Sequence, residues 1–133
     1  MLEETGLTDA KSAITPSDMS GKRDDESPRL DPQEHANFRR YVGKILYAAQ
    51  VRPDVAYSIK ELARRVANPT EDDMRAMRHL IKYIKGTQND VLVLGDSEFG
   101  TESEVEVLSD ANWADGPSRR STSGGAIYFN GFL

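Results

Sequence analysis

Three apolar stripes, each repeating at the spacing of an α-helix, lie between residues 31 and 86 and constrain the fold most. Each begins at a residue suited to a helix N-terminus: Asp31 before Pro32, then Pro53, then Thr70 with Asp73 placed to complete a capping box. The stripes are formed by Phe38, Tyr41, Val42, Ile45, Leu46 and Ala49, by Val55, Ile59, Leu62 and Val66, and by Met74, Met77, Leu80, Ile81 and Ile84. Amphipathic helices with short linkers bury such stripes against one another, so residues 31–88 are predicted to form a three-helix segment.

After Gly86, which is predicted to end the third helix, the apolar pattern changes from helical to strand-like. Residues 91–94, 105–108 and 125–129 are predicted strands, bounded by turn-forming residues. The predicted fold class is therefore α+β, with helices followed by antiparallel strands. A sheet this small is marginally stable by itself, so we interpret residues 89–133 as the truncated N-terminal part of a further domain.

Residues 1–30 show no sustained apolar period and are rich in Ser, Asp, Glu, Lys and Pro. This composition predicts an extended or disordered arm. Within the arm, Thr15 precedes Pro16 and is expected to be extended, because proline disfavours the helical region for the residue before it.

The formal net charge of −5 is distributed unevenly. Residues 35–88 carry eleven basic and five acidic side chains, whereas both flanking segments are acidic. The basic side chains that lie off the apolar stripes are candidates for contacts with nucleic-acid phosphates. They are Arg39, Arg40, Lys44, Lys60, Arg64, Arg65, Lys82 and Lys85. The alternative is that they only keep the outer helix faces solvated.

Several classes of site and location are disfavoured. The chain has no cysteine, and His35 and His79 are too few and too far apart for a zinc site of their own. It shows neither a calcium-binding EF-hand loop nor a P-loop. It also has no apolar run long enough to span a bilayer and no signal-peptide core, so we expect an intracellular protein that is not secreted and has no membrane partner.

The segment from Leu108 to Asp115 carries the strongest candidate for chemistry. Asp110 follows a predicted strand, a position from which a carboxylate can reach a metal ion or a phosphate. The alternative is a polar hairpin loop in which Asp110 accepts backbone hydrogen bonds. Trp113 is expected to pack over the sheet, because an indole buries a large area; exposed stacking is the alternative.

Taken in order, these segments resemble the Pol polyprotein of copia-type LTR retrotransposons, at the junction between reverse transcriptase and ribonuclease H. The resemblance covers residues 13–131. It is carried by Thr15-Pro16, Phe38-Arg39-Arg40-Tyr41-Val42-Gly43-Lys44-Ile45-Leu46-Tyr47, Arg52-Pro53-Asp54-Val55-Ala56-Tyr57, Asn68-Pro69-Thr70-Glu71, Leu80-Ile81-Lys82-Tyr83-Ile84-Lys85-Gly86-Thr87, Ser109-Asp110-Ala111-Asn112-Trp113-Ala114 and Arg119-Arg120-Ser121-Thr122-Ser123-Gly124. Two departures are visible: Asn112 replaces the second aspartate of its motif, and Asp73-Met74 stands where the family usually has His-Trp.

The resemblance implies that residues 31–88 are the helical connection after the reverse transcriptase and that residues 89–133 begin an RNase H-like domain. In the family, ribonuclease H hydrolyses the RNA strand of an RNA–DNA hybrid with paired divalent metal ions. Asp110 corresponds to its first-strand catalytic carboxylate and metal ligand. The implied partners are an RNA–DNA hybrid and the remainder of Pol, and the implied cofactor is Mg²⁺ in the complete parent enzyme.

Because this chain supplies one of several required carboxylates, we expect it to bind no Mg²⁺ tightly and to be inactive by itself. Two other hypotheses are a non-catalytic nucleic-acid-binding helical module that uses the basic residues 39–85, and a decayed copy of an element.

Overall fold

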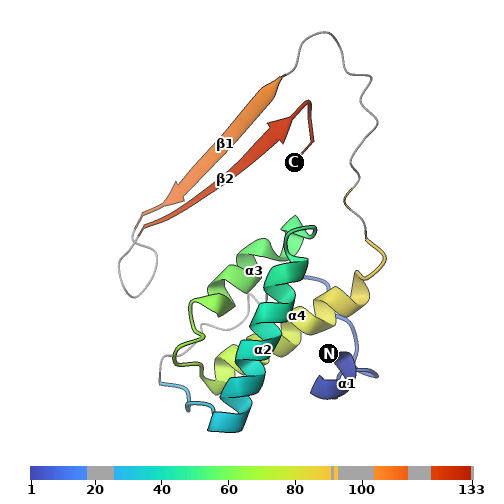
Figure 1. The fold of residues 1–133 in the computed structure, drawn as a ribbon, viewed down its shortest axis with the longest axis vertical. Coiled ribbons are helices and arrows are strands. Elements are labelled where there is room, and N and C mark those ends of the chain that lie inside the picture. The colour runs from blue at the N-terminus through green and yellow to red at the C-terminus, as the bar shows by residue number, and fades with distance from the viewer. Residues whose placement is uncertain (18–25, 91, 93–103, 114–120, 133) are drawn as a thin grey trace. The chain divides into compact units, whose positions relative to one another are not determined.

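The computed structural model describes residues 1–17, 26–90, 92, 104–113 and 121–132. The chain divides into two compact units, Met1–Leu92 and Val93–Leu133 (Figure 1). The first unit contains α1 (Leu2–Thr5), α2 (Pro32–Ala48), α3 (Pro53–Ala63) and α4 (Glu71–Gly86). The second contains β1 (Val105–Asn112) and β2 (Thr122–Phe129). The elements confirm an α+β composition.

The three predicted helices are confirmed, together with the caps that start two of them. The Asp31 side chain accepts a hydrogen bond from the Glu34 amide at 2.8 Å at the start of α2. At the start of α4, Thr70 and Asp73 form a complete capping box, and both side chains are fully buried. These caps satisfy amide groups that the first turn of a helix leaves without partners.

The core of the first unit is built from the predicted stripes, except that Leu46 of the first stripe is 43% exposed. Its fully buried members include Phe38, Ile45, Ile59, Met77 and Leu80. These side chains come from α2, α3 and α4, and each of the three helices contacts the other two.

The second of these helices, α3, is shorter than its apolar stripe suggests. It ends at Ala63, and turns with i-to-i+3 hydrogen bonds lead from there toward Asn68 and Pro69. The residue before a proline avoids the helical region, so the helix ends before that point. Val66 still packs against the core from these turns.

Gly86 does not end α4 as a left-handed cap: it is the last helical residue, and the cap is Thr87 with a φ of −115°. Instead, the N-terminal arm passes close to it. A Cβ atom at position 86 would lie 2.8 Å from the Cβ of Ser12. The local reason for this glycine is therefore a close approach between segments.

The described parts of residues 1–30 pack against the helices of the first unit. Leu7 is buried in the core, while Met1, Leu2 and Ala10 pack against it. Farther along, the Leu30 amide donates to the Pro69 carbonyl at 3.2 Å and the Glu71 amide donates to the Pro28 carbonyl at 2.9 Å. Apolar residues at the start of the arm thus find partners that the local pattern does not reveal.

The second unit is an antiparallel pair in which Asp110 lies opposite Gly124 and Val107 lies opposite Ile127. Both strands are longer than the predicted 105–108 and 125–129, because the polar residues 109–112 pair in register with 122–125. The predicted strand 91–94 falls largely outside the described residues.

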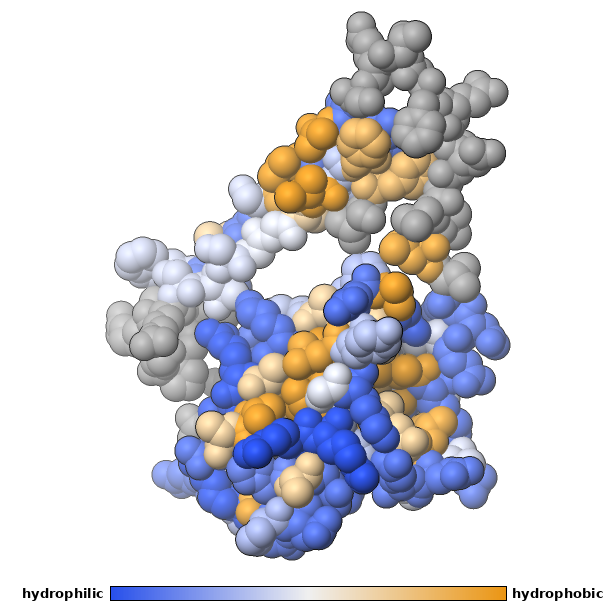
Figure 2. Space-filling view, viewed as in Figure 1, coloured by the Kyte–Doolittle hydropathy of each residue, from blue (hydrophilic) through white to orange (hydrophobic). Residues whose placement is uncertain are grey.

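One face of this pair is apolar and exposed. Val105, Val107, Ile127 and Phe129 share it by alternation and by register, and each is 48% to 65% exposed. Apolar residues gather over the strands in Figure 2. The expectation that Trp113 packs over the sheet is wrong, because the side chain is 89% exposed just after β1. A two-stranded sheet has no second layer of its own to cover it.

Candidate functional site

Asp110 lies within β1 near its C-terminal end, instead of in a loop after the strand. Its Oδ1 atom accepts a hydrogen bond from the Ala111 amide at 2.8 Å. The residue opposite is Gly124, and a Cβ atom there would meet nothing within 4 Å. Asp110 is therefore an exposed residue of the strand, and none of the described residues fills the position across from it.

The fit of Asp110 to a divalent metal is incomplete. A carboxylate oxygen is the kind of ligand that Mg²⁺ takes, but Mg²⁺ sites in proteins draw on further oxygen ligands. Across the described ranges, no group of three or more His, Cys, Asp or Glu side chains is arranged to hold a metal ion.

Two of the predicted phosphate-binding residues on α2 share an acidic partner from the arm. Lys44 Nζ lies 3.3 Å from both carboxylate oxygens of Glu4, and Arg40 Nη2 lies 3.3 Å from one of them. The hydrogen bond from Lys44 lowers the pKa of Glu4 below its ordinary value, with help from the charge of Arg40. Arg39, beside this pair in sequence, is exposed.

The candidates on and after α3 have partners in their own segment or on α4. Arg64 pairs with Glu61 at 3.0 Å, and Arg65 lies 3.4 Å from the buried carboxylate of Asp73. Lys60 lies over the Tyr57 ring, 5.8 Å from its centroid.

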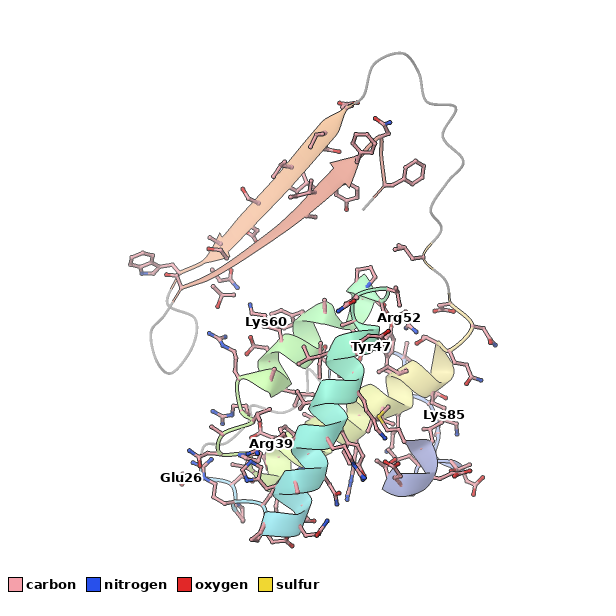
Figure 3. The ribbon with its side chains drawn as sticks, viewed as in Figure 1. Glu26, Arg39, Tyr47, Arg52, Lys60 and Lys85 are labelled. Carbon is pink, nitrogen blue, oxygen red and sulfur yellow. The ribbon has the colours of Figure 1, made fainter. Side chains whose placement is uncertain are left out.

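On α4, Lys85 donates to the carbonyl oxygens of Thr8 and Ala10 in the arm. Lys82 is partly buried, and its carbonyl accepts from the Ala13 amide at 3.4 Å. Figure 3 shows Lys85 beside α1, and Arg39 and Lys60 on the opposite side of the view. The predicted basic set is thus distributed over α2, α3, the turns after α3, and α4. Among the described residues, five of its eight members have ion-pair or hydrogen-bond partners, and a sixth, Lys60, lies over an aromatic ring.

A polar network that sequence reasoning missed joins the start of α3 to the end of α4. Its members, the Arg52 network, are Arg52, Asp54, Tyr83 and Thr87. Arg52 binds both carboxylate oxygens of Asp54, at 2.9 Å and 2.7 Å, and also donates to the carbonyl and the hydroxyl of Thr87 at 3.0 Å and 2.7 Å. The Tyr83 hydroxyl donates to Asp54 at 2.9 Å. Figure 3 labels Arg52 at this position.

These contacts shift the acidity of the network. The Arg52 guanidinium holds the pKa of Asp54 below its usual value, and the Tyr83 hydrogen bond adds to this. Desolvation and the bond to Asp54 raise the pKa of Tyr83. A hollow of about 260 Å³ lies beside the network, lined by Val51, Arg52, Pro53, Asp54, Tyr83, Asp90 and Leu92. Arg52 donates its hydrogen bonds to Asp54 and Thr87. The network therefore connects the start of α3 to the end of α4.

The signal for this network was present in the Arg52-Pro53-Asp54 and Tyr83-to-Thr87 segments, which both belong to the motifs quoted above. The motifs did not reveal that residues 52–54 and residues 83–87 lie in contact. The chain is 31% identical over 131 residues, 96% of its length, to the retrovirus-related Pol polyprotein from transposon RE1 of Arabidopsis thaliana. It is homologous to a segment of copia-type Pol polyproteins.

A further Pol polyprotein is similar over nearly the whole chain. The Pol polyprotein from transposon TNT 1-94 of Nicotiana tabacum is 27% identical over 98% of this chain. The chain spans only 8% of the transposon RE1 Pol polyprotein and 10% of the TNT 1-94 one. It also matches an uncharacterized mitochondrial protein of Arabidopsis thaliana at 28% identity over 93% of this chain, and spans half of that protein.

No protein-family model matches the chain, and no solved structure matches it. In the part of the chain that the structure describes, no helix is long and apolar enough to cross a membrane.

Proposed function

We propose that this chain serves, within a retrotransposon Pol protein, as the helical connection after the reverse transcriptase and as the first strands of an RNase H-like domain that acts on RNA–DNA hybrids. Homology to copia-type Pol over nearly the whole chain supports this proposal. The observation that carries it is the exposed carboxylate of Asp110 on β1, opposite Gly124, where no side chain stands beside it.

In this proposal Asp110 contributes one oxygen ligand to a Mg²⁺ site that other parts of Pol complete. Hydrolysis of the hybrid requires several carboxylates converging on paired metal ions. Among the described residues, no group of three or more His, Cys, Asp or Glu side chains is arranged to hold a metal ion. The chain by itself is therefore expected to show neither nuclease nor polymerase activity.

A chimera tests the role of Asp110. This chain replaces the homologous segment of an active copia-type Pol protein, and RNA–DNA hybrid cleavage and DNA synthesis are measured separately. Asp110→Asn is expected to abolish cleavage and to preserve synthesis, because the amide removes a metal-binding charge without changing shape. The matched control is Glu106→Gln, an exposed acid on the same face of β1 that is expected to leave both activities unchanged.

Three results would contradict the proposal: a chimera without hybrid cleavage, an Asp110→Asn chimera that still cleaves, or cleavage by the isolated chain that depends on Mg²⁺ and on Asp110. The first would argue against the segment's place in Pol. The second would argue against the role of the carboxylate, and the third against the need for other parts of Pol.

A further inference from the structure

Arg40 and Lys44 form a convergent cationic pair on the outer surface of α2. They are four residues apart in a helix, so their side chains emerge from the same face one turn apart. Both reach a single carboxylate, that of Glu4, with nitrogen-to-oxygen distances of 3.3 Å. Two cations that meet at one small anion define a binding point for an anionic group.

Apolar packing holds the carboxylate at this point. Leu7 is buried in the core, and Met1 and Leu2 pack against it. Gly6 adopts a φ of +66° that turns the chain after α1, and Lys85 holds the carbonyls of Thr8 and Ala10. These contacts place α1 beside α2, so Glu4 reaches the pair from a separate segment 36 residues before Arg40.

The ion pairs of Glu4 with Arg40 and Lys44 are weak enough for another anion to replace the carboxylate. The side chains of Arg40, Lys44 and Glu4 are 51%, 45% and 39% exposed, so water and salt screen all three charges. The helix that carries Glu4 has four residues and cannot be stable away from the core. A polyanion that offers many phosphates can therefore compete with one screened carboxylate.

We propose that Arg40 and Lys44 bind a backbone phosphate of the nucleic acid, and that Glu4 occupies this point in the free chain as an internal competitor. The inference rests on the proposed function for the identity of the ligand, an RNA–DNA hybrid. It adds a specific phosphate-binding point within the predicted basic set. It also predicts that Glu4 weakens binding by the free chain, because this carboxylate must leave the point before a phosphate can occupy it.

The test compares two substitutions with the same change in net charge. Glu4→Gln removes the competing charge, and Glu3→Gln removes the neighbouring charge, which has no ion-pair partner among the described residues. The dissociation constant of each variant for a labelled RNA–DNA hybrid is measured by fluorescence anisotropy as salt is raised from about 50 mM to about 200 mM. Circular dichroism verifies that both variants keep their helices.

Glu4→Gln is expected to bind the hybrid about three- to tenfold more tightly than Glu3→Gln at the lower salt concentration. Its affinity should fall more steeply with salt, because in the Glu3→Gln variant salt also screens the ion pairs of the competing Glu4 and so offsets part of the loss. In an Arg40→Gln, Lys44→Gln background, Glu4→Gln should no longer tighten binding. The Arg40→Gln, Lys44→Gln variant thus distinguishes competition at this cationic pair from a general effect of net charge on affinity.

Equal affinities of the Glu4 and Glu3 variants would overturn the proposal, as would tightening that persists without Arg40 and Lys44, or no hybrid binding by any variant. None of these results depends on cleavage by the chimera. Failure of the competition model is therefore distinguishable from failure of the proposed function.

Discussion

Two helical glycines show how surroundings decide the role of a residue. Gly43 in α2 and Gly86 at the end of α4 both lack a positive φ, so neither is required by its backbone conformation. A Cβ atom at position 43 would meet nothing within 4 Å, whereas one at position 86 would meet the Cβ of Ser12 at 2.8 Å. Only Gly86 is required by packing.

Substitution of these glycines by alanine is therefore expected to have opposite effects. Gly43→Ala should raise the free energy of unfolding by about 0.5–1 kcal/mol, because alanine loses less backbone entropy in a helix. Gly86→Ala should lower it by about 1 kcal/mol, because the arm must shift away from α4. Urea denaturation measures both. Hydrogen exchange at the Ala13 amide, which bonds to Lys82, reports the arm directly. A stabilising Gly86→Ala would contradict the close approach.

The pKa of Asp54 leads to a prediction about acid stability. Its folded-state pKa is lowered mainly by Arg52, so Asp54 stabilises the fold above its unfolded pKa of about 4 and loses this contribution as the pH falls through the folded value. Arg52→Gln should lower the free energy of unfolding near neutral pH by about 1 kcal/mol and flatten its decline in acid. Denaturation measured at a series of acidic pH values tests both.

Arg64→Gln serves as the control, since it removes an exposed pair with Glu61 and should change stability by less than about 0.5 kcal/mol. An acid profile that is identical in the wild type and in Arg52→Gln would show that the Arg52 network does not set the pKa of Asp54.

At the scale of elements, the N-termini of α2 and α4 differ in burial. Asp31 caps α2 from an exposed position, whereas Thr70 and Asp73 cap α4 in the interior, next to the segment around Pro28 and Leu30. Inside a protein, a polar group that loses its partner cannot turn to water. A cap of the same kind therefore contributes more to the free energy of unfolding at α4 than at α2.

Removal of each cap should show this difference. Thr70→Ala is expected to cost about 2 kcal/mol of unfolding free energy, and Asp31→Ala about 0.5–1 kcal/mol. Urea denaturation followed by circular dichroism gives both values. Equal costs would show that burial of the α4 cap does not matter.

At the scale of the whole molecule, the two units differ in what stabilises them. Among the described residues, every member of the hydrophobic core lies in Met1–Leu92. The strands of the second unit instead carry exposed apolar side chains such as Val107 and Ile127. The helical unit is therefore expected to be stable by itself.

Residues 1–92 expressed alone should accordingly unfold cooperatively, with a free energy within about 0.5 kcal/mol of the complete chain. Residues 93–133 alone should show no cooperative transition, because an isolated two-stranded sheet is marginal in water. Thermal and urea denaturation of both pieces test this. Loss of helical structure from 1–92 would mean that the second unit supports the first.

Local signals explain the successes of sequence reasoning. The periods and caps that start at Asp31, Pro53 and Thr70 act within one or two helical turns, so the helices could be predicted from neighbours in sequence. Asp110 was selected as a candidate by resemblance to a motif, and its role stays a prediction. Its place inside β1 was missed, because the pairing of residues 109–112 depends on the partner strand.

What tertiary structure alone decided are the contacts between distant segments. Arg52 and Thr87 are 35 residues apart, Glu4 and Lys44 are 40 apart, and Ser12 reaches Gly86 from the arm. The amino-acid sequence determined the helices, their apolar faces and the kinship with Pol. The tertiary structure decided which charges are already paired, because that depends on how those helices pack and on where the core anchors the N-terminal segment.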